Sequence, residues 1–289
     1  MRLEEAIAID PTCVPAHQLL GQAYLKQKEY DKALALWKKL LETQPDSKMA
    51  RQWIAHVERV KKDDEHLAEL ARTIEKRPKD ADARLERARL LAARREWQNV
   101  LADLEPVLAA KPDSYDALTL AGNACYGLGR FGEAVAHLQR AVAASKDSME
   151  ATLWLKKAQE MNKTQTRLRD VEARLVKSPA DGDLYLESGR LWYRLGQMRN
   201  AMARLAKAAQ LSPRNAAAQR EYALLLLRIG RMDEALKLLE TCVKLEPGNK
   251  ENAKLLEAAK KTRDMHAKMR KGASGVPAHG ASKAGDSQK

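Results

Sequence analysis

Aromatic residues are scarce in this 289-residue chain: they make up 4% of it, and only one is phenylalanine. Apolar residues nevertheless reach 45%, so most of the apolar content is alanine and leucine. β-Sandwiches and barrels depend on aromatic and β-branched residues, and this composition therefore argues against both. Charged residues make up 31%, which together with alanine and leucine is typical of long, closely packed helices.

Cysteine is also rare, with Cys13, Cys125 and Cys242 more than 100 residues apart. An odd number without a CxxC pair or a Cys/His cluster gives no support to a disulfide framework or a zinc site. We therefore expect buried free thiols. The six histidines are scattered without ligand spacing, and we expect neither a metal site nor a cofactor.

Long apolar runs are missing. The most apolar stretch, residues 222–227, is far too short to span a bilayer. The N-terminus lacks the basic stretch and apolar core of a secretory signal. These absences predict a cytoplasmic protein with no membrane insertion.

Prolines recur at a fixed interval of 33 or 34 residues, with one gap of 67. They are Pro11, Pro45, Pro78, Pro112, Pro179, Pro213 and Pro247. Between successive prolines, two apolar stripes with i, i+3, i+4, i+7 spacing are separated by a short polar or glycine break. Such a period predicts stacked units, each of them a helical hairpin.

Residues at fixed places within the period have packing reasons. A glycine such as Gly21 or Gly189 in the middle of a first helix allows a close approach by the second helix, where we expect an alanine to face it. The turns carry Gly129, Gly196 and Gly230, where a positive φ suits glycine. Large side chains open the second helices and can cover the turns; they are Tyr30, Trp97, Phe131, Met198 and Met232.

On these residues the chain resembles the tetratricopeptide repeat (TPR) family. The resemblance implies an all-α fold, a right-handed superhelical solenoid of antiparallel helix pairs. It is close in residues 14–45, 115–146, 182–213 and 216–247, fair in 81–112, and weak in 48–78 and 149–179. It says little about function, because one fold serves many functions.

The period predicts the following segments: the second helix of an incomplete repeat at 1–11, seven units at 12–45, 46–78, 79–112, 113–146, 147–179, 180–213 and 214–247, a C-terminal helix at 248–270, and a disordered basic tail at 271–289. Because Met1 falls inside a second helix, we expect either that this helix acts as a cap or that the natural protein begins further upstream.

The weak units, 46–78 and 147–179, lie 101 residues apart and match without a gap. In them His66 and Arg167 replace the small residue of the second helix, and Lys156 takes a first-helix place that suits glycine or alanine. Charged groups between closely packed helices carry a desolvation cost. We therefore expect splayed or re-angled hairpins there.

Nothing in the sequence supports an enzyme. Residues 127–132 match GxGxxG, the phosphate-binding turn of dinucleotide-binding domains, but that turn needs a preceding strand and a βαβ unit. Here a helix is predicted before it, and its glycines coincide with the turn of the repeat.

The resemblance implies that the first helices line a concave groove, in which ligands lie in extended form. The candidate partner-binding residues are Arg89, Asn123, Tyr126, Lys157, Arg190, Tyr193, Arg194, Arg220, Leu227 and Arg228. Arginine binds carboxylates through two hydrogen bonds, and tyrosine offers rigid contact area. We therefore expect a non-catalytic scaffold that binds an extended, acidic protein segment.

Two alternatives stay open. The net charge of +13 and the pI of about 9.6 are also compatible with nucleic-acid binding, although residues 250–289 alone contribute +6 of that charge. The chain is also compatible with the accessory TPR portion of a larger multidomain enzyme. A clamp for the carboxylate tail of a chaperone is disfavoured, because Asp183 and Glu187 take two of the places where such a clamp has basic or amide residues.

Overall fold

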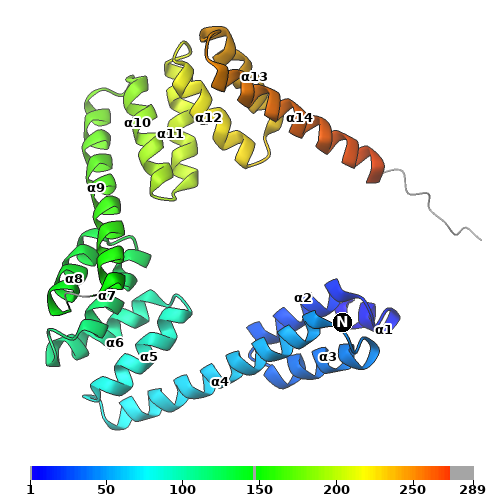
Figure 1. The fold of residues 1–289 in the computed structure, drawn as a ribbon, viewed down its shortest axis with the longest axis vertical. Helices are drawn as coiled ribbons and strands as arrows, with labels where there is room; N and C mark the ends of the chain where they lie inside the picture. The colour runs from blue at the N-terminus through cyan, green and yellow to red at the C-terminus, as the bar shows by residue number, and fades with distance from the viewer. Residues whose placement is uncertain (1, 146–147, 274–289) are drawn as a thin grey trace, which may run out of the picture. The chain divides into compact units, whose positions relative to one another are not determined.

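The computed structural model describes residues 2–145 and 148–273, and within them it contains fourteen helices and no strand (Figure 1). The helices are α1 (Arg2–Ile9), α2 (Val14–Lys26), α3 (Tyr30–Thr43), α4 (Lys48–Lys76), α5 (Ala81–Ala93), α6 (Trp97–Ala110), α7 (Tyr115–Gly127), α8 (Phe131–Ala144), α9 (Met149–Lys177), α10 (Gly182–Arg194), α11 (Met198–Leu211), α12 (Ala216–Arg228), α13 (Met232–Leu245) and α14 (Lys250–Ala273). The predicted all-α array of helix pairs is confirmed, and the handedness of its superhelix stays a prediction.

Five helical hairpins account for ten of these helices: α2–α3, α5–α6, α7–α8, α10–α11 and α12–α13. Each second helix begins at the large residue that the sequence predicts for that place. The three turn glycines have φ between +74° and +80°, as expected. Lys28 and Arg95 occupy the same place in the other two turns with φ of 58° and 60°. A hairpin of this kind therefore forms without glycine, at the cost of an unfavourable backbone conformation.

The mid-helix glycines do allow close packing, but against a different residue from the alanine that we expected. A Cβ at Gly21 would lie 2.8 Å from Nε1 of Trp37, and one at Gly189 would lie 2.6 Å from Cγ of Leu205. Both distances are shorter than a real Cβ atom shows to any other heavy atom. The glycine makes room for a large side chain that lies one turn beyond the expected alanine, and this side chain is almost completely buried.

The expectation of splayed hairpins in residues 46–78 and 147–179 is wrong, because α4 and α9 are single helices of 29 residues each. Asp64 and Gln165 stand where the other units open their second helix with a large apolar side chain. Without such a side chain to cover a turn, breaking the helix would bury little apolar surface. The absence of glycine is not the decisive factor, since Lys28 and Arg95 also form turns.

The charged residues of these two helices avoid the cost that we expected by staying at the surface. His66 Nε2 lies 3.2 Å from Glu86 and Arg167 Nε lies 2.6 Å from Glu187. Lys156 is exposed. A continuous helix thus lets each of these polar groups reach solvent or an acidic partner on the next helix.

The 101-residue period is exact at the level of helix bounds. α2, α3, α4, α5 and α6 begin and end 101 residues before α7, α8, α9, α10 and α11 respectively, and α7 and α8 have the same relation to α12 and α13. α14 begins 101 residues after α9. One period therefore consists of a long helix and two hairpins, rather than three hairpins.

The chain divides within α9 into two compact units, residues 1–159 and 160–289. Each unit has its own buried clusters, and each cluster joins only neighbouring helices. In the first unit, Trp37 and Trp53 stack at 5.3 Å between α3 and α4. In the second, Leu205 and Leu225 belong to the cluster between α10, α11 and α12. Contacts between neighbours alone are the defining property of a repeat array.

The predicted C-terminal helix at 248–270 corresponds to α14, which runs from Lys250 to Ala273. Leu255 and Leu256 of this helix pack against the buried cluster of α12, α13 and α14. Most of the predicted tail at 271–289 lies outside the described residues. No helix within the described part of the chain is long and apolar enough to cross a membrane.

Candidate functional site

The predicted groove residues belong to both units. Arg89, Asn123, Tyr126 and Lys157 lie in the first, and Arg190, Tyr193, Arg194, Arg220, Leu227 and Arg228 lie in the second. Four residues of the second set line one cleft of about 430 Å³. We call it the arginine cleft, and define it by Arg190, Tyr193, Arg194, Leu205, Glu221, Leu224, Leu225 and Arg228.

Helical spacing brings these side chains together. Arg190, Tyr193 and Arg194 have i, i+3, i+4 spacing on α10, so they share one face. The α12 residues of the cleft have i, i+3, i+4, i+7 spacing from Glu221 to Arg228. Leu205 of α11 and Leu225 of α12 are buried in the cluster that joins α10, α11 and α12. Charged side chains therefore line the exposed part of the cleft, and Leu205 and Leu225, which we call the leucine floor, line its buried part.

The charges of the arginine cleft are unbalanced. Arg190 Nη2 lies 3.1 Å from Glu221 Oε1, and this is the one carboxylate among the cleft residues. The guanidinium of Arg228 lies 5.5 Å from the centre of the Tyr193 ring, in a cation–π arrangement. Within residues 2–145 and 148–273, no carboxylate lies within ion-pair distance of Arg194 or Arg228. Two guanidinium groups therefore retain unused hydrogen-bond donors.

Apolar surface is exposed beside these charges. The side chains of Tyr193 and Leu224 are each 38% exposed. An exposed large apolar residue is unremarkable alone, but two in a cleft above a leucine floor offer surface that a ligand can bury. The cleft therefore combines guanidinium donors with an apolar contact area.

Two predicted residues of the second unit lie outside this cleft. Arg220 is directed to Glu251 of α14, with 3.7 Å between Nη1 and Oε2, and 25% of its side chain is exposed. Leu227 packs against the buried cluster of α12, α13 and α14. Both side chains thus have structural partners.

The first unit holds a separate set of predicted residues on α7 and α9. Tyr126 makes edge contacts with Phe131 and Trp154, at 5.3 and 5.4 Å between ring centres. Lys157 Nζ lies 4.5 Å above the Trp154 ring. Asn123 Oδ1 is buried and has no hydrogen-bond partner among the described residues. Arg89, on α5, pairs with Asp116 at 2.5 Å.

Thr119 lies one turn before Asn123. Its hydroxyl is also buried and has no hydrogen-bond partner within the described part of the chain. Buried polar groups are nearly always hydrogen-bonded, and two such groups on one helical face are unusual. Both groups therefore lack, within the described residues, the hydrogen bond that buried polar atoms normally have.

Sequence reasoning missed Glu221 and the leucine floor of the arginine cleft. The signal for Glu221 was present, because it lies three residues before Leu224 and seven before Arg228, on the same helical face. Leu205 gave no such signal. It is a second-helix residue, and it reaches the cleft because it packs against Gly189.

The remaining reactive residue types occupy structural positions. Burial raises the pKa of the Cys125 thiol to about 11 and also raises that of Cys242, so both thiols are protonated at neutral pH. Within the described residues there is no group of three histidine, cysteine, aspartate or glutamate side chains arranged to hold a metal ion. The GxGxxG match is the end of α7, its turn and the start of α8, with no strand before it.

Comparison with known proteins gives a consistent family assignment. A family model described as tetratricopeptide repeat matches residues 1–56 and 193–259, and a second model of the same description matches residues 101–148. Together these ranges cover more than half of the chain. No curated protein matches it.

Several solved structures are similar at low sequence identity. A tetratricopeptide repeat protein from Parabacteroides merdae is 17% identical, with 89% of this chain and 98% of that chain covered and a TM-score of 0.36. YrrB, described as a TPR protein with an unusual peptide-binding site, is 17% identical, with coverage of 65% and 97% and a TM-score of 0.31. MamA from Desulfovibrio magneticus is 17% identical, with coverage of 58% and 96% and a TM-score of 0.29.

The matched family models agree with the 34-residue period, the helical hairpins and the positive-φ turn glycines described above. The chain is a member of the tetratricopeptide repeat family.

Proposed function

We propose that this protein is a non-catalytic interaction scaffold that binds an acidic, partly apolar protein segment through the arginine cleft. Membership of a family whose members generally bind other proteins supports the general role. The observation that carries the specific proposal is the pair of guanidinium groups, Arg194 and Arg228, that have no carboxylate partner among the described residues.

An acidic ligand follows from the charge of the cleft. Three arginines face one glutamate, and Arg190 already holds that glutamate. A hydrogen bond between an arginine and a carboxylate is roughly twice as strong as a bond between neutral groups. A neutral segment would leave these donors to water, whereas aspartate or glutamate side chains would pair with them.

The apolar requirement follows from the surface between the arginines. A ligand side chain that covers Tyr193 and Leu224 would remove the exposed part of both from water, at about 25 cal/mol per Å² of apolar area. The best ligand therefore alternates acidic and apolar residues. Asn123, Tyr126 and Lys157 would contribute a second contact region in the first unit, where Asn123 Oδ1 lacks a partner among the described residues.

The test is a charge reversal in the cleft. Peptides displayed from a random library are selected on the full chain, and the best binder is measured by fluorescence polarisation. The variant Arg190→Glu plus Arg194→Glu should weaken binding about tenfold or more, which is 1.4 kcal/mol or more. The matched control is Arg199→Glu plus Lys207→Glu, which makes the same charge change at exposed places on α11 and should leave binding unchanged.

Two outcomes would contradict the proposal. The first is equal loss in both double variants, which would show an effect of net charge alone. The second is binding of nucleic acid that competes with the peptide and weakens steeply with salt, as phosphate contacts do. That second result would favour the nucleic-acid alternative.

A further inference from the structure

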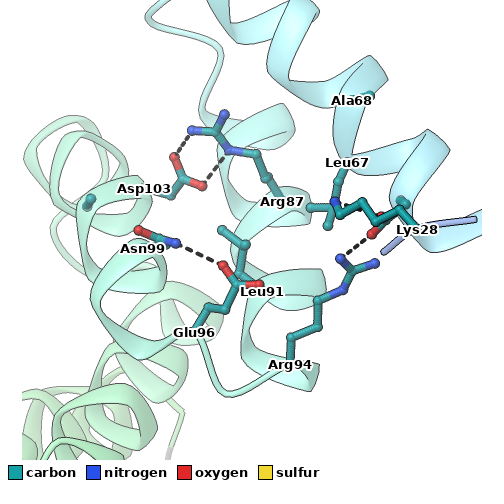
Figure 2. A pocket seen from close by; sticks show the side chains of 11 residues that line it. Lys28, Leu67, Ala68, Arg87, Leu91, Arg94, Glu96, Asn99 and Asp103 are labelled. Atoms are coloured by element: carbon teal, nitrogen blue, oxygen red, sulfur yellow. Dashed lines mark hydrogen bonds and ion pairs between the residues drawn. The ribbon is translucent and has the colours of Figure 1, made fainter. Parts of the chain in front are cut away.

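A second cavity, of about 520 Å³, lies beside the long helix α4, entirely within the first unit (Figure 2). We call it the α4 cleft. Its lining residues come from α4, α5, α6 and the turns before α3 and α6; those that the argument uses are Lys28, Asp64, Leu67, Leu91, Arg94 and Glu96.

The α4 cleft lies on the opposite side of α5 from the predicted groove residue Arg89. Arg87, Leu91 and Arg94 have i, i+4, i+7 spacing and share the face that lines the cleft. Arg89 is two positions from Arg87, which places it about 200° around the helix, and it pairs with Asp116 of α7. The α4 cleft is therefore separate from the proposed peptide-binding surface.

One carboxylate organises the α4 end of the cleft. Asp64 accepts hydrogen bonds from the Tyr30 hydroxyl, from Arg94 Nη1, and from Lys28 Nζ at 2.9 Å. Burial opposes its ionisation, but these hydrogen bonds outweigh that cost and lower its pKa to about 2. Two cations thus share one anion, which leaves this end with a net charge of +1.

One nitrogen of the Arg94 guanidinium lacks a hydrogen-bond acceptor within the described residues. Its Nη2 atom is buried and has no hydrogen-bond partner within the described residues, although Nη1 donates a hydrogen bond to Asp64. By contrast, Arg87 in the wall of the cleft binds Asp103 through both Nε and Nη2. A buried guanidinium nitrogen without an acceptor is costly, so this position favours a ligand that supplies one.

The other end of the cleft has the opposite sign. The carboxylate of Glu96 accepts from Asn99 Nδ2 at 2.8 Å, and no cation within the described residues is paired with it. Between the two ends lie the apolar side chains of Leu67 and Leu91. An anionic group is therefore directed to the Lys28 and Arg94 end, with its carbon stem over the leucines.

The turns beside the cleft are also unusual. Lys28 and Arg95 adopt positive φ, where the three other hairpins have glycine. The positions 101 residues after Lys28 and Arg94 are Gly129 and Leu195. The second period therefore lacks both cations at the matching places, and its residues provide natural replacements for a test.

We propose that the α4 cleft is a second binding site, which takes a carboxylate on a short aliphatic stem from a protein partner. One carboxylate oxygen accepts from Arg94 Nη2 and the other lies near Lys28 Nζ. The source is either a glutamate side chain or a free C-terminus, because both present the same group. The site functions independently of the arginine cleft.

Nuclear magnetic resonance of the arginine Nε–H groups tests this on the full chain. The probes are acetyl-leucyl-glutamate amide, acetyl-leucyl-glutamine amide, acetyl-leucyl-leucine with a free C-terminus, and inorganic phosphate. Arg94→Leu assigns the Arg94 signal. We expect a saturable shift of that signal with one or both carboxylate peptides, at least tenfold tighter than with the glutamine peptide; the tighter of the two carboxylate peptides identifies the source.

Three variants make the result specific to this site. Lys28→Gly plus Arg94→Leu, which installs the residues found at 129 and 195, should abolish the binding as followed by the remaining arginine signals. Arg94→Lys keeps a cation for Asp64 but removes Nη2, and should weaken binding at least fivefold even if the first variant is unstable. Arg190→Glu plus Arg194→Glu should have no effect, so a failure of the arginine cleft proposal is separate from a failure here.

Several results would overturn the proposal. These are the absence of a saturable shift with either carboxylate peptide, equal binding of the glutamine peptide, tighter binding of phosphate than of both carboxylates, or unchanged binding in Arg94→Lys.

Discussion

The two long helices have the same length and the same place in the 101-residue period, yet their C-terminal halves are held by different polar networks. Asp64 of α4 binds Tyr30, Lys28 and Arg94. In α9 the central acid is Glu172, which accepts hydrogen bonds from Ser188 at 2.6 Å, Trp192 at 3.2 Å and Arg204 at 2.6 Å.

One position on the second helix of the next hairpin carries opposite charges in the two periods. Asp103 on α6 pairs with Arg87, whereas Arg204, 101 residues later on α11, is the cation that pairs with Glu172. A shared backbone arrangement thus does not require shared charges. In both periods an acid of the long helix pairs with an arginine of the next hairpin, Asp64 with Arg94 and Glu172 with Arg204, but these residues stand at different positions of the period.

We expect the largest loss of stability from substitutions that interrupt the long helices. Proline at Lys62 or Lys163 would remove a hydrogen bond and clash inside a helix, so each variant should lose about 3 kcal/mol of unfolding free energy. Urea unfolding followed by circular dichroism measures this, with Lys62→Ala and Lys163→Ala as controls. If proline cost less than about 1 kcal/mol, the segment would behave as a turn.

The next test exchanges the acid of α4 for the residue of α9. Asp64→Gln removes a buried charge that holds three donors, and should cost about 1.5–3 kcal/mol. The folded-state pKa of Asp64 is lowered to about 2. Its contribution is therefore fully present above the usual aspartate pKa and is lost as the pH falls towards 2. The stability difference between wild type and variant should shrink across that window; a constant difference would contradict the assignment.

A smaller effect is expected at Glu172, whose side chain is 28% exposed. Glu172→Gln keeps acceptor and size but removes the charge paired with Arg204, and should cost about 1–2 kcal/mol. A double-mutant cycle with Arg204→Gln isolates the pair. A coupling near zero would show that Ser188 and Trp192 alone hold this contact.

The smallest effect comes from exchanging turn residues between the periods. Arg95→Gly relieves a positive φ of 60° and should raise stability by roughly 0.5–1 kcal/mol, whereas Gly196→Arg should lower it by a similar amount. Thermal unfolding of both variants measures the effect. A loss of stability in Arg95→Gly would mean that the arginine side chain contributes more than its backbone strain costs.

Much of the fold follows from local pattern. The starts of α3, α6, α8, α11 and α13 coincide with the large residues that the sequence predicts, and the turn glycines have the expected φ. The site was partly predictable for the same reason: Arg190, Tyr193, Arg194 and Arg228 share faces by helical spacing, and they line one cleft. Leu205 could not be placed from its own helix, because it reaches the cleft through contact with Gly189.

By itself, the sequence determined the all-α repeat array, its 34-residue and 101-residue periods and the hairpin register, because these depend on neighbours within a few residues. Only the tertiary structure decided that α4 and α9 are continuous, and that Arg94 keeps one unpaired nitrogen within the described residues. The physical reason is that a helix breaks only where the returning segment buries enough surface, and a charge is satisfied only by groups that packing brings near it.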